Sequence, residues 1–324
     1  MKFEDLKTSL TNGVKPIYLI EGEDAFLRES SLKLLKDAFL TEPDFNLSNL
    51  SVDDVKQDPE VLFTAVQSYP FMGDYRFVVL REYYPNAQEL KSKMLKSVFN
   101  EPIDTAVLVI LNQDKSLNLK KLETVTVVEC SRLPDDVIAK WVRAETKKSE
   151  VIIDKSAIDL LISYTNGDMT KINGEVNKLI SYVGKGGQIA ENDVESVCVK
   201  DSDYNVFEIA DALGKGNTEK VLSMIKETLS KSSNRYQLFI NVYYHFRKLL
   251  HVSISSLNDT DLASSLNIKN PKAIFVLKNQ AKNFKVKRLK EICDKFAFYD
   301  ASFKRGDVAE ENAFWNAIYN SLLK

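Results

Sequence analysis

The chain has 324 residues, with 44 Lys and Arg against 46 Asp and Glu, and its formal net charge is −2. At about 150 residues per domain, this length suggests two or three domains. The apolar fraction of 44% and the charged fraction of 28% are ordinary for globular proteins, which excludes the disordered and fibrous classes. Residues 1–203 hold 25 basic and 34 acidic side chains, and residues 204–324 hold 19 and 12. The near-zero total therefore hides an acidic first part and a basic last part.

Cysteine use and hydropathy bound the kind of protein further. Cys130, Cys198 and Cys293 are far apart and form no CxxC spacing, which is typical of a reduced, intracellular chain. The two histidines have no accompanying ligand motif, so no metal site is predicted. The first residues carry acids and do not read as a signal peptide. The longest apolar run, Ala106–Leu111, is too short to span a bilayer. We expect a cytoplasmic protein with no membrane partner.

Short apolar runs separated by helix-length segments mark the first 130 residues. Continuous apolar runs are typical of strands buried on both faces of a parallel sheet. They predict strands at Ile17–Ile20, Phe77–Leu80, Ala106–Leu111 and Val125–Cys130, with a weaker candidate at Phe45–Leu50. The order of elements predicts an α/β doubly wound domain over residues 1–130.

After Cys130 the strand patterns stop and helical patterns continue to the end. Helices are predicted after Pro134, after Asp154 and after Asp168, where the last two residues act as N-caps. These make a small all-helical domain over residues 131–203. Residues 204–324 form a third, all-helical domain. Its predicted helices lie at 207–213, 221–229, 236–252, 271–284, 286–303 and 308–323.

The turn after the first predicted strand is where a nucleotide-binding domain would hold its phosphates. Such a loop needs glycine-held backbone N–H groups, a lysine and a Ser or Thr for Mg²⁺. Here the turn is Glu21-Gly22-Glu23-Asp24, with a single glycine, no Gly-Lys-Ser/Thr and three carboxylates. Like charge opposes phosphate binding. The sequence predicts the outline of an ATPase without a working site, no cofactor, and no catalytic constellation elsewhere.

The loop before the strand at Phe77 is unusually apolar. It combines two aromatic residues and a methionine with turn formers: Tyr69, Pro70, Phe71, Met72 and Gly73. Pro70 fixes the approach to the pair and Gly73 permits a sharp turn after it. An adjacent aromatic residue and methionine on a stiffened loop suit the apolar pocket of a partner. The alternative, which residue-type frequencies favour, is that both side chains fold back onto the sheet as core.

A basic interval lies in the last third of the chain. Residues 262–290 hold eight Lys and Arg and no acid. Such a stretch can follow a phosphate backbone or an acidic partner. The candidate contacts with DNA or a partner are Lys282, Lys285, Lys287 and Arg288. The alternative, equally open here, is a solvated helix face with its apolar residues turned inward.

Taken in order, these segments resemble the delta subunit family of the bacterial DNA polymerase III clamp loader. The resemblance covers nearly the whole chain. Ile17–Glu29 is similar to the family's opening strand and degenerate phosphate loop, and Pro70–Gly73 with Arg76–Leu80 is similar to its clamp-contacting segment and next strand. Further similar stretches are Cys130–Trp141, the Gly167–Tyr182 helix pattern, Phe207–Leu213 and Phe246–Leu250.

The resemblance implies a fold and a role. It implies an AAA+-like N-terminal domain that lacks a functional P-loop and binds the clamp, a small helical lid domain, and a C-terminal helical collar for oligomerisation. The family binds the sliding clamp (beta subunit) and opens its ring for loading on primed DNA, while ATP is hydrolysed by other subunits. The implied partners are the clamp, the loader's ATPase subunits and its delta-prime subunit through the collar, and primed DNA in the complex.

The resemblance also assigns residues. It places the clamp contact at Tyr69–Gly73, chiefly at Phe71 and Met72, where the best-known family members have Leu and then Phe. The chain would have no catalytic site of its own, although as a holoenzyme subunit it would be classed with the DNA-directed DNA polymerases. The alternatives are an AAA+-type DNA-binding replication scaffold and an NTPase with a divergent phosphate site.

Overall fold

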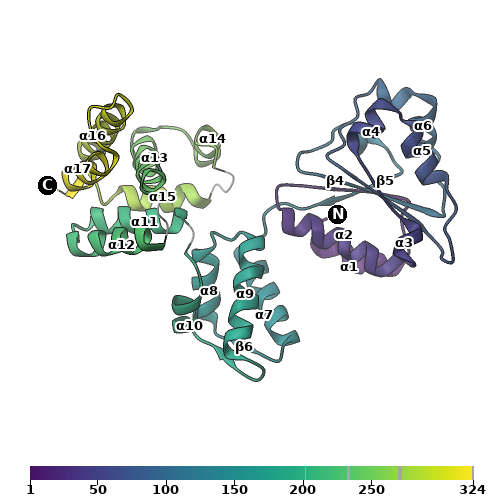
Figure 1. Ribbon diagram of the computed structural model, residues 1–324, viewed down its shortest axis with the longest axis horizontal. Helices are drawn as coiled ribbons and strands as arrows, with labels where there is room; N and C mark the ends of the chain where they lie inside the picture. The colour runs from purple at the N-terminus through teal and green to yellow at the C-terminus, as the bar shows by residue number, and fades with distance from the viewer. Residues whose placement is uncertain (201, 232–233, 269–271, 323–324) are drawn as a thin grey trace. The chain divides into compact units, whose positions relative to one another are not determined.

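The computed structural model describes residues 1–200, 202–231, 234–268 and 272–322. The chain divides into two compact units (Figure 1). The first comprises residues 1–162 and 167–197, and the second comprises residues 163–166 and 198–324. The division at residues 1–130, 131–203 and 204–324 remains a prediction.

A five-stranded parallel sheet organises the first unit. Its strand order is β2-β3-β4-β1-β5, and every pairing is parallel. The strands are β1 (Ile17–Glu21), β2 (Leu47–Leu50), β3 (Arg76–Arg81), β4 (Ala106–Asn112) and β5 (Val125–Glu129). All residues of β1 and β4 are buried, because strands at the centre of a covered parallel sheet contact core on both faces.

Helices cover both faces of this sheet (Figure 1). The helices and 3₁₀ turns are α1 (Phe3–Ser9), η1 (Leu10–Asn12), α2 (Ala25–Phe39), α3 (Pro43–Asn46), α4 (Val52–Gln57), α5 (Glu60–Gln67), η2 (Glu89–Lys91), α6 (Lys93–Asn100) and η3 (Leu119–Lys121). Alternate strand residues divide between two cores. Tyr18 and Ile20 pack with residues of α1 and α2, whereas Ile17 and Leu19 pack with residues of α4, α5 and α6. This alternation follows from the period of two in a strand.

The doubly wound sheet confirms the predicted fold class, with one correction. The four strong apolar runs coincide with β1, β3, β4 and β5. The weaker candidate at Phe45–Leu50 is correct only from Leu47, because Phe45 and Asn46 belong to the short helix α3. Pro43 at the first position of α3 fixes the helical φ there. This difference matters, because α3 lies against the loop that follows α5.

The remainder of the first unit is mainly helical. It consists of α7 (Asp135–Lys148), α8 (Lys155–Tyr164), whose last two residues count with the second unit, α9 (Met169–Val183) and α10 (Glu191–Val197). Asp168 caps α9 as predicted, since its carboxylate accepts from the backbone N–H of Lys171 at 3.1 Å. The prediction of an all-helical segment is wrong in one respect. Two-residue strands β6 (Ile152–Ile153) and β7 (Gln188–Ile189) pair in parallel, and pairs this short leave no periodic pattern in a sequence.

The second unit is helical throughout its described residues. Its helices are α11 (Ser202–Gly214), α12 (Thr218–Lys231), α13 (Arg235–Ile254), α14 (Asp259–Ser265), α15 (Lys272–Ala281), α16 (Val286–Lys304) and α17 (Glu310–Leu322). Six match predicted segments, and the seven-residue α14 was not anticipated. The ends predicted at residues 271 and 323 lie outside the described residues.

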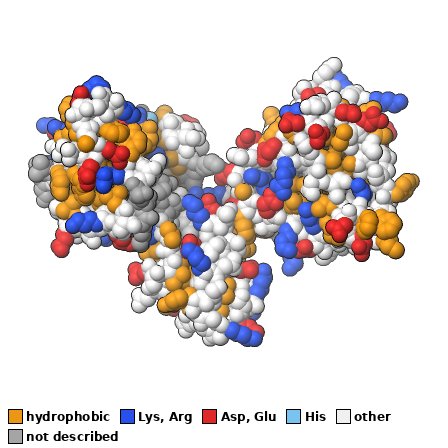
Figure 2. All heavy atoms as spheres, in the orientation of Figure 1, with side chains coloured by type: hydrophobic (Ala, Val, Ile, Leu, Met, Phe, Trp, Pro, Cys, Tyr) orange, Lys and Arg blue, Asp and Glu red, His pale blue; other side chains and the backbone are white. Residues whose placement is uncertain are grey.

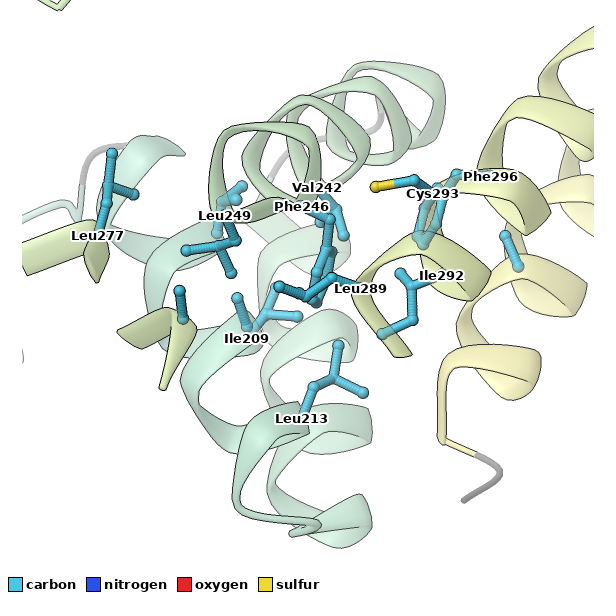
Figure 3. Close-up of a cluster of buried hydrophobic side chains, with 14 of the residues drawn as sticks. Ile209, Leu213, Val242, Phe246, Leu249, Leu277, Leu289, Ile292, Cys293 and Phe296 are labelled. Carbon is cyan, nitrogen blue, oxygen red and sulfur yellow. The ribbon is translucent and has the colours of Figure 1, made fainter. Parts of the chain in front are cut away.

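The core of the second unit gathers around α13. Phe246 of α13, Phe296 of α16 and Ile209 of α11 are fully buried and point toward one another (Figure 3). The rings of Phe246 and Phe296 are stacked with centroids 6.4 Å apart. Since α13 supplies apolar residues to α11, α15 and α16, this helix holds the unit together. Among all described helices, none is long and apolar enough to cross a membrane.

Candidate functional site

The loop between α5 and β3 exposes its large apolar side chains. Tyr69 is 84% exposed, Phe71 52% and Met72 81%. The alternative interpretation, in which Phe71 and Met72 fold back onto the sheet as core, is therefore wrong. Burying them would require the loop to fold onto the sheet, but the sheet faces there are already covered by α1, α2 and α4–α6. Hydrophobic side chains gather at the surface on this edge of the α/β part, beside α3 (Figure 2).

A single buried amide fixes the course of this loop. Asn46, at the end of α3, is fully buried. Its Oδ1 accepts from the backbone N–H of Phe71 at 2.7 Å, and its Nδ2 donates to the carbonyl oxygen of Phe71 at 2.8 Å. Nδ2 also donates to the carbonyl oxygen of Thr41 at 2.8 Å. The side chain thus takes the place of a neighbouring strand residue and satisfies both backbone groups of Phe71.

Other contacts hold the two ends of the loop. A Cβ atom on Gly73 would overlap Oγ1 of Thr41, so this glycine permits a close approach of the loop to the end of α2. Met72 has a φ of 49°, a left-handed conformation uncommon for residues other than glycine. At the start of β3, the Arg76 guanidinium donates to the carbonyl oxygen of Phe45 and to Oγ of Ser48. The loop is therefore shaped by tertiary contacts on several sides.

Phe45 extends the apolar surface, although the sequence predicted it as the first residue of a strand. Its side chain is 56% exposed, and its ring lies 4.9 Å from that of Phe71, centroid to centroid. The exposed apolar set, here called the α3-loop surface, consists of Phe45, Tyr69, Phe71 and Met72. The only sequence signal for it was Glu42-Pro43-Asp44, a helix-start pattern that would have separated Phe45 from the strand.

The turn after β1 is closed by the chain's own groups. The N–H of Gly22 donates to the carbonyl oxygen of Asn112 at 3.2 Å, and the N–H of Asp24 donates to that of Cys130 at 3.1 Å. The Arg28 guanidinium donates to the carbonyl oxygen of Gly22. A phosphate-binding loop needs these backbone N–H groups directed at the ligand. Here both bond to neighbouring chain segments.

Two of the three carboxylates in this turn also have internal roles. Asp24 caps α2, accepting from the N–H of Leu27 at 3.0 Å. Burial raises the pKa of Asp24, an effect that this hydrogen bond opposes. Glu21 is buried, pairs with the ammonium of Lys120, and accepts from the N–H of Ser116 at 3.0 Å. Asp24 therefore occupies the helix N-terminus with a negative charge where a phosphate would bind.

The carboxyl ends of β3 and β4 also form hydrogen bonds within the fold. The side chain of Asn112, at the end of β4, is fully buried and accepts from the N–H of Tyr83 at 3.0 Å while donating to its carbonyl oxygen at 2.8 Å. Glu29 of α2 receives two hydrogen bonds from Arg81 at the end of β3. These bonds lower the pKa of Glu29. Among the described residues, no three His, Cys, Asp or Glu side chains come together as metal ligands.

The candidate basic residues of the second unit divide into two kinds. Lys282, Lys285 and Lys287 are exposed, and Lys282 donates only to the nearby side chain of Asn279 among the bonds described. Arg288 instead donates to the carbonyl oxygens of Asn320 and Ser321 at 3.3 and 3.0 Å. It thereby satisfies carbonyl groups left open at the end of α17. Lys269, in the same interval, lies outside the described residues.

Comparison with known proteins identifies the family. A family model described as "DNA polymerase III, delta subunit" matches residues 18–131. A second, described as its C-terminal domain, matches residues 203–321. The chain belongs to the DNA polymerase III delta subunit family. One match lies in each unit, and this assignment confirms the resemblance seen in the sequence.

Individual relatives agree with this assignment. The chain is 22% identical over 325 residues to DNA polymerase III subunit delta of Bacillus subtilis, covering 94% of this chain and 92% of the relative. It is 23% identical over 287 residues to a probable DNA polymerase III subunit delta of Aquifex aeolicus, covering 83% and 80%. The solved structure of the Bacillus subtilis DNA clamp loader delta protein matches with a TM-score of 0.73 at 21% identity, covering 99% of each chain. That structural match shows a shared fold.

Proposed function

We propose that this delta subunit binds the sliding clamp through the α3-loop surface and opens the clamp ring for loading on primed DNA. The observation that carries the proposal is the exposure of Phe71 and Met72 on a tethered loop. Large exposed apolar side chains that cluster on one surface are typical of a protein interaction site. Family membership makes the clamp the expected occupant.

The size of the surface suits an interaction centre. Burying a fully exposed apolar side chain contributes about 1.5–3 kcal/mol. Because Met72 is 81% exposed and Phe71 52%, the two together supply roughly 2–4 kcal/mol. Micromolar binding requires about 8 kcal/mol, and association has its own entropic cost. Phe45 and Tyr69 add exposed apolar area beside the pair. We therefore propose that all four side chains contact the clamp, with Phe71 and Met72 at the centre.

The test is Phe71→Ala combined with Met72→Ala, measured by titration against the clamp of the same organism. We expect binding to weaken at least a hundredfold and the melting temperature to change little, because both side chains already face water. Leu117→Ala is the matched control, since Leu117 is 68% exposed in the same unit. Retained clamp binding, or a large drop in melting temperature, would contradict the proposal.

We propose further that opening proceeds without ATP hydrolysis by this chain. The support is that Gly22 and Asp24 use their backbone N–H groups within the fold, and that Asp24 caps α2 where a phosphate would lie. Hydrolysis would then occur in the ATPase subunits of the loader. This favours the clamp-opening role over the alternative of an NTPase with a divergent phosphate site.

The second unit is proposed to act as the collar that joins the ATPase and delta-prime subunits and lies near primed DNA. Its exposed lysines Lys282, Lys285 and Lys287 are the proposed contacts with DNA phosphates. Replacing all three by Gln should weaken binding to primed DNA. The negative slope of log K against log salt concentration should become shallower by about 2 to 3. The control replaces three exposed lysines of α7: Lys140, Lys147 and Lys148. An equal loss in both variants would contradict the assignment.

A further inference from the structure

We propose that Asn46 is the positioning residue of the α3-loop surface, holding Phe71 and Met72 in their binding geometry before the clamp arrives. The inference rests on the proposed clamp contact and adds a residue that bonds to the loop without meeting the clamp. Asn46 has no exposed surface, so it cannot itself meet a partner. Its effect on binding must pass through the loop.

The side-chain amide of Asn46 uses most of its hydrogen bonds to hold the loop between α5 and β3. An asparagine amide has two donor hydrogens and an acceptor oxygen. Both hydrogens bond to carbonyl oxygens, of Thr41 and Phe71, and the oxygen accepts from the N–H of Phe71. Two of these three bonds therefore fix the backbone of the residue whose side chain is proposed as the contact. A polar group buried without such partners would be costly.

Asn46 lies directly before β2, the edge strand of the sheet. The next residue, Leu47, begins β2 and pairs with Phe77 of β3. The loop thus connects through one side chain to the edge of the sheet, 25 residues away in the sequence. Binding groups held in place before association avoid the ordering cost that a free loop would incur on binding. Loss of the tether should therefore weaken binding although every contacting side chain remains.

The experiment compares Asn46→Ala with the wild-type chain in clamp titrations. We expect at least a tenfold loss of affinity. Hydrogen exchange of the Phe71 amide gives a readout independent of the clamp, because its protection comes from the Asn46 oxygen. That amide should exchange much faster in the variant. Asn49→Ala, at an exposed position three residues further on, is the control and should alter neither measurement.

A cross-link distinguishes positioning from general destabilisation. A Cβ on Gly73 would lie 3.4 Å from Cβ of Thr41, close to the separation found across disulfides. Thr41→Cys with Gly73→Cys can therefore tether the loop covalently. In the Asn46→Ala background, the oxidised form should recover most of the lost affinity and the reduced form should not. The same cysteine pair beside the native Asn46, oxidised and reduced, is the reference for this recovery, because a side chain at Gly73 can itself alter binding.

The outcomes separate this inference from the proposed function. Wild-type affinity in Asn46→Ala, while Phe71→Ala with Met72→Ala abolishes binding, overturns the positioning role alone. It is also overturned if the oxidised cross-link in Asn46→Ala binds the clamp more weakly than the oxidised cross-link beside the native Asn46. Absence of clamp binding by the wild-type chain overturns both proposals.

Discussion

Two loops of the first unit are held by the same kind of bond but present opposite groups to their surroundings. In the turn after β1, the N–H groups of Gly22 and Asp24 bond to carbonyl oxygens of neighbouring segments. In the loop before β3, both backbone groups of Phe71 bond to the buried side chain of Asn46. In the first loop, the polar groups that could bind a phosphate are used internally. In the second, the backbone is used internally and the apolar side chains remain outside.

The difference shows that the same local restraint can close one site and build another. A phosphate site depends on backbone N–H groups, so using them internally removes the site. A protein contact depends on side chains, so using the backbone internally leaves the contact intact and makes it rigid. Under the proposed function, this domain acts as a binding module because its phosphate-type turn is closed while its apolar loop stays exposed.

The largest expected effect on stability comes from replacing a glycine of these loops by alanine, at Gly22 in the first loop and at Gly73 in the second. Gly22 has a φ of 142°, and a Cβ there would overlap the carbonyl oxygen of Cys130. Backbone strain and overpacking each cost about 1–3 kcal/mol, so Gly22→Ala should lower the free energy of unfolding by about 3 kcal/mol or more. In Gly73→Ala the new Cβ overlaps Oγ1 of the exposed Thr41 side chain and lies 3.2 Å from Nδ2 of Asn46, so it displaces side chains and not backbone. The substitution should cost about 1 kcal/mol or less but weaken clamp binding.

Denaturant unfolding of both variants, with clamp titrations alongside, measures this contrast. Ser for Gly at the exposed Gly174, where a Cβ meets nothing within 4 Å, controls for adding a side chain to this unit. The comparison fails if Gly73→Ala is the more destabilised protein, or if Gly22→Ala loses clamp binding while remaining as stable as the wild type.

A smaller effect is expected at Asp24. Removal of an N-cap costs about 1 kcal/mol, whereas Asn caps about as well as Asp. Asp24→Ala should therefore be less stable than the wild type at neutral pH, and Asp24→Asn should be equal to it or slightly more stable. Burial raises the pKa of Asp24 above its ordinary value of 3.8. The folded state then holds the proton more tightly, so the contribution of Asp24 to stability falls as pH rises through its folded-state pKa.

Unfolding measured from pH 3 upward tests this sign, because the wild type should lose stability relative to Asp24→Asn as pH rises. Asp74→Asn, in the exposed loop, is the matched control for replacing an aspartate of this unit by asparagine. A fluorescent ATP analogue is titrated against the same proteins. Tight, saturable binding by the wild type or by Asp24→Asn would show that the turn after β1 opens to nucleotide, contrary to the comparison.

Strands and most helices could be predicted because their patterns are local. The runs that form β1, β3, β4 and β5 are almost entirely apolar at successive positions, and successive side chains of a strand point to opposite faces of the sheet. Burial on both faces is therefore visible in the sequence itself. The boundary at Phe45 was wrong because an aromatic residue before Leu47 fits a strand as well as a helix. The strands β6 and β7 were missed because two residues carry no periodicity.

The order and spacing of its segments determined this protein's family from sequence alone, and the missing Gly-Lys-Ser/Thr after β1 determined the prediction that the phosphate site does not work. Only the tertiary structure decided that Phe71 and Met72 face outward, that Phe45 lies beside them, and that Arg288 bonds to the end of α17. The physical reason is that these outcomes depend on contacts between residues tens of positions apart. A residue type sets what a side chain can bind, but its exposure and its partners are set by what packs around it.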